Sequence, residues 1–148
     1  MKTPRLIVTL IVAPLVLVAC GGSDDGSSSG GSTSPAALTG TWVLDGGSID
    51  ALSVDAPTGT DVTIAFADGK ASGSAGCNTF SGSYEAADDG SLTFGPLAST
   101  MMACDDPVMA LETAYLGALG DVSSFEVDGD LALTAGSITL TYAADSGS

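Results

Sequence analysis

The chain has 148 residues, enough for one domain of ordinary size. It carries 18 acidic and 3 basic residues, a formal net charge of -15, and no histidine. The missing histidine excludes histidine-based catalytic triads and zinc sites with imidazole ligands. The acidity excludes nucleic-acid binding, because that binding depends on Lys and Arg neutralising phosphates.

Residues 1–19 are predicted to be a lipoprotein signal peptide. Lys2 and Arg5 precede an apolar run over residues 6–18 that is too short to span a bilayer comfortably. The run ends in Leu17-Val18-Ala19-Cys20, which resembles the lipobox of bacterial lipoproteins, where the chain is cut before an acylated cysteine. The alternative is an N-terminal membrane helix with an incidental cysteine.

We expect lipidation at Cys20, export, and attachment to the bacterial cell membrane. Gly21, rather than Asp, follows the cysteine, which favours the outer membrane in a cell with two membranes. Cleavage leaves Lys70 as the only basic side chain against all 18 carboxylates. Because an anionic headgroup surface repels such a domain, the attachment is expected to depend on the lipid alone.

Residues 20–36 are predicted to be the lipidated cysteine followed by a disordered linker. The segment from Gly21 to Pro35 is almost entirely Gly and Ser and offers no side chains for a core. The folded domain is expected over residues 37–145.

Short apolar alternations separated by Gly and Asp-Gly fill this domain and predict antiparallel strands. Val62 to Phe66 alternates in this way before a favoured hairpin turn, Asp68-Gly69. Further strands are expected at residues 40–44, 49–54, 71–77, 80–86, 91–94, 99–103, 124–127, 131–134 and 137–142. With no helices long enough for parallel crossovers between them, these strands predict a mainly β fold, a small barrel or sandwich.

One helix is predicted, over about residues 106–119. Asp106 is expected as its N-cap, Pro107 at its first position and Gly120 as its C-cap. Its apolar positions recur at helical spacing: Val108, Leu111, Tyr115 and Leu119. They form one face for packing on the sheet. Glu112 borders or enters this face, so its carboxylate needs partners.

Two thiols remain if Cys20 is acylated, Cys77 and Cys104, in a compartment that permits disulfides. Their pairing is the prediction, and by the loop-entropy estimate a ring of about 28 residues contributes on the order of 3 to 4 kcal/mol. The alternative is a reactive or metal-binding cysteine pair. It lacks a Cys-x-x-Cys spacing, a histidine or a basic cluster that would lower a thiol pKa.

Three sequence patterns cover about residues 37–142. The first joins Leu38, Gly40, Trp42 and Leu44. The second is Gly76-Cys77-Asn78-Thr79-Phe80-Ser81-Gly82-Ser83-Tyr84. The third runs from Thr100 through Met102 and Cys104 to Met109, Glu112, Tyr115, Leu116 and Leu119. Together they resemble the META domain family, also called HslJ-like.

The resemblance implies a compact, barrel-like β fold with one packed helix in a small exported or lipid-anchored bacterial protein. Members of the family have been associated with heat shock, antibiotic tolerance and secretion-linked traits. No shared catalytic set is known that could be carried onto this chain, so the resemblance does not imply an enzyme. The motif residues are expected to be structural: Trp42, Gly76, Asn78, Phe80, Gly82, Tyr84, Met102, Met109 and Glu112.

Asp105, Asp106 and Glu112 lie close together in the sequence and could form a paired-carboxylate or calcium site. Capping and the helix dipole explain acidic residues at a helix start, and the calcium-loop pattern is missing. We therefore expect no catalytic residue, metal ligand or cofactor here.

Two polar motif residues have specific expected roles. The Asn78 amide is expected to satisfy nearby backbone groups rather than a ligand. Glu112 is expected to be partly buried, with donors from backbone amides or from a hydroxyl such as that of Tyr84. Lys70 is the only side-chain cation available to it.

The leading functional prediction is a non-catalytic envelope lipoprotein with an interaction or stress-related role, whose partner is an unknown envelope protein or ligand. The alternative is a carrier, since a closed barrel of this size can hold one small apolar molecule. A hydrolase that uses carboxylates alone is the third possibility.

Overall fold

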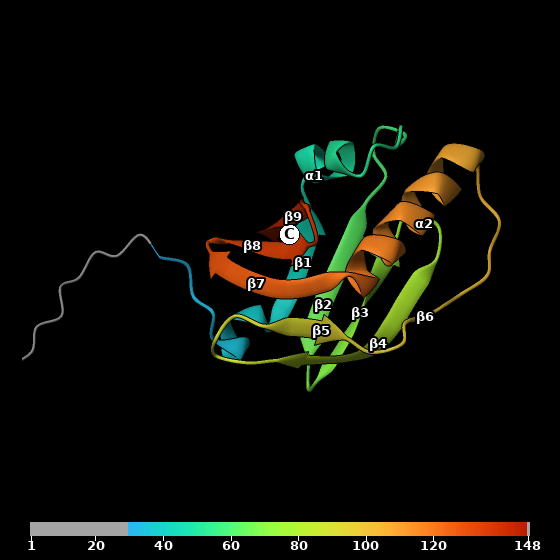
Figure 1. Ribbon diagram of the computed structural model, residues 1–148. Coiled ribbons are helices and arrows are strands. Elements are labelled where there is room, and N and C mark those ends of the chain that lie inside the picture. Colours follow the sequence, from blue (N-terminus) through green and yellow to red (C-terminus); the bar gives the residue numbers. More distant parts are fainter. Residues whose placement is uncertain (1–29, 148) are drawn as a thin grey trace, which may run out of the picture.

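The computed structural model describes residues 30–147 (Figure 1). The predicted signal peptide, Cys20 and most of the predicted linker lie outside this range. Within it, nine antiparallel strands form a nearly closed barrel with one main helix, α2 (Asp106–Gly120). The predicted mainly β fold class is confirmed.

The barrel is a single sheet that curls back on itself. Its strands are β1 (Gly40–Leu44), β2 (Val62–Ala67), β3 (Lys70–Ala75), β4 (Thr79–Ala86), β5 (Leu92–Phe94), β6 (Ala98–Ser99), β7 (Val122–Asp128), β8 (Asp130–Ala135) and β9 (Ile138–Ala144). Their order is β5-β4-β3-β2-β1-β9-β8-β7, with β6 beside β4. The seam closes where Ser91 bridges Ser124 and the Phe125 amide donates to the Gly90 carbonyl at 2.8 Å.

The core follows from the alternation along the strands. In β2, Val62, Ile64 and Phe66 are buried while the residues between them are more exposed. The hairpin to β3 turns through Asp68 and Gly69, both with positive φ, as its sequence predicts. The largest fully buried side chains include Tyr115 of α2 and Tyr142 of β9, so the interior of the barrel is filled by protein.

α2 contacts β3, β5 and β8 and lies across the strands (Figure 1). Its N-cap is Asp105 rather than the predicted Asp106, since Pro107 fits the second position of the helix as well as the first. The Asp105 side chain makes no capping hydrogen bond. Gly120 is the last helical residue rather than the C-cap; Asp121 takes that place at φ -98°. In residues 30–147, no helix combines the length and apolarity needed to cross a membrane.

The strand predicted at residues 49–54 is wrong. That region belongs to α1 (Gly46–Ala51), which begins where Asp45 accepts a hydrogen bond from the Gly47 amide at 3.0 Å. Thr141 of β9 holds the helix in place, because its amide donates to the Ser48 hydroxyl of α1 at 2.7 Å. A capping carboxylate and a tertiary hydrogen bond override the apolar alternation.

The end of the predicted linker is ordered on the barrel. Ser32 pairs with Val127 at the edge of β7, and the Thr33 hydroxyl donates to the Asp88 carbonyl at 2.7 Å. A short 3-10 helix, η1 (Pro35–Leu38), then leads into β1. The backbone of these last linker residues thus bonds to the edge of β7 that faces away from β8.

Candidate functional site

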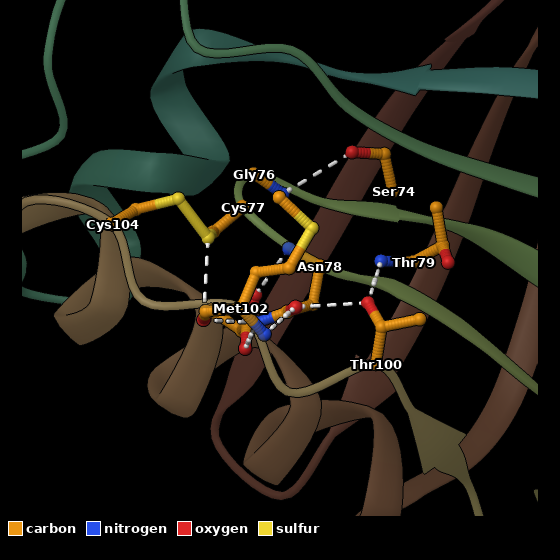
Figure 2. The surroundings of a disulfide bond; sticks show 9 residues. Ser74, Gly76, Cys77, Asn78, Thr79, Thr100, Met102 and Cys104 are labelled. Carbon is orange, nitrogen blue, oxygen red and sulfur yellow. Dashed lines mark hydrogen bonds between the residues drawn. A yellow bond between two sulfur atoms is a disulfide. The ribbon is translucent and has the colours of Figure 1, made fainter.

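The second and third sequence patterns meet at one end of the barrel. Cys77 lies in the turn between β3 and β4, and Cys104 lies in the segment that leads into α2. They form a disulfide, with their Cα atoms 6.0 Å apart and 27 residues between them in sequence (Figure 2). The structure thus contains the disulfide that the sequence predicts. The Cys77 sulfur has no proton to donate, and it lies 3.6 Å from the Met102 carbonyl oxygen.

Asn78, next to the disulfide, is 1 % exposed, and its side chain joins three segments. Its Oδ1 accepts from the Met102 amide at 2.6 Å and from the Thr100 hydroxyl at 2.8 Å. Its Nδ2 donates to the Met102 carbonyl at 3.1 Å and to Glu112 Oε1 at 2.8 Å. Figure 2 shows Asn78 between Met102 and Thr100. All its hydrogen-bonding capacity goes to the protein itself.

Glu112 on α2 is 7 % exposed, and Asn78 supplies the donors to both of its oxygens. The Asn78 backbone amide donates to Oε2 at 2.7 Å, and the Asn78 side-chain amide donates to Oε1 at 2.8 Å. A backbone amide is one of the donors expected from the sequence. The side-chain amide is not, because the sequence alone does not bring Asn78 to α2.

The other suggested partners of Glu112 are elsewhere. Tyr84 packs its ring edge-to-face on Phe66, with centroids 5.0 Å apart, and the proposed hydroxyl bond is not formed. Lys70 is exposed at the start of β3, whereas Asn78 follows the end of that strand. Among residues 30–147, every buried side-chain nitrogen and oxygen nevertheless has a partner.

The motif glycines allow close packing at this end. Gly76 begins the turn at φ +109°, a conformation that L side chains rarely adopt. A Cβ on Gly82 would lie 2.7 Å from Leu97 Cδ2 and 2.9 Å from the Pro96 carbonyl oxygen. The loop before β6 can therefore lie against β4 only if a glycine is present.

The remaining motif residues divide into core and surface. Trp42 is buried and donates to the Leu38 carbonyl at 2.9 Å, and Phe80 packs on the Tyr115 ring at 5.9 Å. Met109 is half-buried. Met102, in contrast, is 61 % exposed. Its neighbour Met101, which the sequence patterns do not single out, is 93 % exposed.

Two tyrosines and one aspartate have shifted pKa values. The hydroxyls of Tyr115 and Tyr142 lie 3.1 Å apart, and burial raises the pKa of both phenols. Hydrogen bonds from the side chain and backbone of Ser91 lower the pKa of the exposed Asp89. Neither case brings an acid and a base together in a cleft.

The carboxylates near the start of α2 do not gather into a site. Asp105 and Asp106 are exposed, whereas Glu112 is buried and occupied by Asn78. Within residues 30–147 no three side chains of the metal-binding types form a cluster that could hold a metal ion.

An open groove of about 730 Å³ crosses the outer face of the sheet. Its lining comes from β2, β3, β4 and β6 and is mainly small hydroxyl residues: Thr63, Ser72, Ser74, Thr79, Ser81, Ser99 and Thr100. The lining contains no charged side chain, and the groove is open to solvent. It differs from the enclosed apolar lumen that a carrier needs.

The comparisons with known proteins agree with this geometry. The sequence model of the META domain family matches residues 36–146. No curated protein matches the chain. A protein from Burkholderia xenovorans, solved by NMR, is 25% identical, with a TM-score of 0.60, over 98% of this chain and 100% of its own. A DUF4847 family protein from Bacteroides vulgatus, solved by crystallography, is similar in fold, with a TM-score of 0.52 at 16% identity over 75% of this chain and 96% of its own.

Proposed function

We propose, from the premise that the chain belongs to the META domain family, that this protein is a lipid-anchored envelope protein whose domain acts by binding another envelope component and not by catalysis. The META domain family is not a known enzyme family. Membership of this family therefore supports a non-catalytic role for the domain.

The observation that carries the proposal is the internal use of the polar motif. Both Glu112 oxygens accept hydrogen bonds from Asn78. The Asn78 side-chain amide uses its remaining bonds on Thr100 and Met102, so the network joins the β3–β4 turn, the Met102 segment and α2. A general base or a metal ligand needs a lone pair that faces a substrate. Glu112 is only 7 % exposed and Asn78 only 1 %, so neither presents one at the surface. The motif therefore supports a scaffold that presents a surface, rather than a reactive centre.

The filled interior argues against the carrier alternative. Tyr115 and Tyr142 are fully buried and hydrogen-bonded to each other inside the barrel. A bound apolar molecule of useful size would have to displace such side chains, which costs several kcal/mol in a closely packed core. Binding at the outer surface needs no such rearrangement.

The anchor is supported by the leader pattern that ends at Cys20 and by the acidic domain that follows it. Its test is the fractionation of cells that produce the full chain or the Cys20→Ser variant. We expect the parent in the detergent phase, carrying labelled fatty acid. The variant should be unlabelled and outside that phase, since a Gly/Ser segment and an acidic domain offer no second membrane signal. A variant that stays in the detergent phase would contradict the anchor.

The binding role is tested by mild cross-linking of intact cells, followed by purification from solubilised envelopes. We expect a defined envelope component to be purified with the parent and to be recovered in much smaller amount with the Cys20→Ser variant. The variant is released from the membrane surface, where the parent and this component would meet. An equal recovery with both proteins would argue that membrane attachment plays no part in the interaction.

A further inference from the structure

Two adjacent methionines stand out on the surface of the domain. Met101 is 93 % exposed and Met102 is 61 % exposed, and they are the large hydrophobic residues that residues 30–147 leave exposed. Single exposed apolar residues are common on protein surfaces. Two neighbouring thioethers at one end of a strongly acidic domain need a more specific explanation.

The backbone beneath this pair is held from both sides. The Thr100 amide donates to the Thr79 carbonyl at 3.0 Å, and the Met102 amide and carbonyl both bind the Asn78 side chain. Two residues later, Cys104 ties the segment to Cys77 (Figure 2). A buried network therefore fixes the backbone while the side chains point away from the core. Such a surface loses little backbone entropy when it binds.

The pair also lies far from where the chain enters the domain. Asn78 precedes β4, whereas the Asp88 carbonyl, which Thr33 contacts, follows it. β4 has 8 residues, so the two ends are separated by roughly 25 Å. The methionines are thus at the end opposite to the entry of the linker.

The charges around the pair restrict its partner. Asp105 and Asp106 follow it closely and are exposed, and Lys70, the only basic residue after Arg5, lies at the opposite end of β3. A second copy of this chain would bring like charges together, which costs free energy. A partner with Lys and Arg around an apolar pocket would gain from both features.

We propose that Met101 and Met102 are the apolar anchor of a protein-docking surface, and that its partner is a protein with an apolar pocket bordered by Lys and Arg. This inference rests on the proposed binding function and names the surface that performs it. Flexible, polarisable thioethers suit such a pocket because they adapt to its shape. The acidic surroundings would speed the encounter and favour a basic rim.

The test places a photo-cross-linking amino acid at position 101 of the full chain in cells, and at position 128 as the control. Asp128 is exposed at the end of β7, close to Val127, which pairs with Ser32 of the entering chain. We expect an adduct from position 101 that position 128 does not give. Mass spectrometry of the adduct should place the cross-link in an apolar pocket bordered by Lys or Arg.

Two further measurements are made on the same adduct. Its yield should fall about tenfold with Met102→Ser, as for an anchor residue at an interface, and should also fall as salt is raised. Thermal melting of Met102→Ser should match that of the parent, because the side chain is mainly in solvent. Equal adducts from both positions, an adduct with a second copy, or no loss with Met102→Ser would overturn the proposal.

Failure of the docking surface is distinguishable from failure of the proposed function. Fractionation of the same cells reports the anchor, and chemical cross-linking reports binding through any surface. If the protein stays in the membrane fraction and still binds a component while position 101 gives nothing specific, the docking surface is wrong and the proposed function stands. If the protein leaves the membrane and binds no component, the proposed function itself is wrong.

Discussion

Glu112 shows how one buried carboxylate can be stabilised without a cation. Its partner is a single residue, Asn78, which offers a backbone and a side-chain donor to the two oxygens. Hydrogen bonds to a charged group contribute roughly 1.5–3 kcal/mol each. They offset the cost of burying the carboxylate, and they connect α2 to the turn between β3 and β4 at the same time.

The first prediction compares two substitutions at this position. Glu112→Gln keeps one acceptor for Asn78 but sets an NH2 group against the second donor, so we expect a loss of roughly 1–3 kcal/mol. Glu112→Ala leaves both donors unpaired and should cost more, about 3–5 kcal/mol. Urea unfolding measures both values.

Thr113→Ala is the matched control, because Thr113 is the next residue on α2 and is exposed. It should change the free energy of unfolding by less than about 0.5 kcal/mol. If both Glu112 variants unfold like the parent while an envelope phenotype disappears, the residue is functional and the structural assignment is wrong.

The second prediction concerns the buried tyrosine pair at alkaline pH. Burial raises the pKa of Tyr115 and Tyr142 in the folded state, while the unfolded phenols ionise near pH 10. The unfolded state therefore loses protons first, so stability is complete below about pH 10 and falls as the pH rises above it. Absorbance near 295 nm should show these two phenolates appearing together with unfolding. Their ionisation in a protein that keeps its native circular dichroism would contradict this.

At the scale of elements, the sequence predicts most strands because their turns are local. Asp68-Gly69 and Gly129 adopt positive φ in their own hairpins, so their chemistry specifies the turn without outside help. Two other elements depend on distant contacts. α1 is fixed by Thr141, and the strand predicted to reach Ala103 stops at Ser99 because Asn78 holds the Met102 backbone instead.

The third prediction is the contribution of the disulfide. Replacing both Cys77 and Cys104 by Ser should lower the free energy of unfolding by about 3 kcal/mol, with most of the effect on the unfolded chain. The domain should still fold, because Asn78 holds the same segment independently. Urea unfolding of the parent with and without reductant gives the matched comparison. Unchanged unfolding midpoints in both experiments would show that the cross-link adds nothing.

The fourth prediction uses two glycines in opposite settings. A Cβ on Gly73 of β3 would lie 1.9 Å from the Thr63 carbonyl oxygen, so Gly73→Ala must push β2 and β3 apart and should destabilise by more than about 1 kcal/mol. A Cβ on Gly117 of α2 would meet nothing within 4 Å, so Gly117→Ala should stabilise by up to about 1 kcal/mol through helix propensity. Equal thermal shifts in the same direction would contradict this reading.

At the scale of the whole molecule, the sequence patterns predict the fold class and the disulfide better than they predict the contacts of single residues. The fold class and the disulfide follow from strand texture, cysteine count and the resemblance of the motifs. The exposure of Met101 and the supply of both Glu112 donors by Asn78 do not. Both depend on contacts between segments more than 20 residues apart in the sequence. Local periodicity carries no information about such long-range contacts.

The last prediction follows from the charge of the whole domain. With a net charge of -15, the folded chain brings like charges closer than the unfolded chain does, so screening should favour folding. Raising salt from about 10 mM to 150 mM shortens the Debye length from roughly 30 Å to 8 Å and should raise the melting temperature by a few degrees.

Asp128 and Asp130 face each other across the β7–β8 turn, so Asp130→Asn should stabilise by about 0.2–1 kcal/mol at low salt and by less at high salt. Ser137→Asn, at another exposed turn, is the neutral control. A melting temperature that falls with salt, or an Asp130→Asn gain independent of salt, would mean that surface repulsion does not limit the stability of this domain.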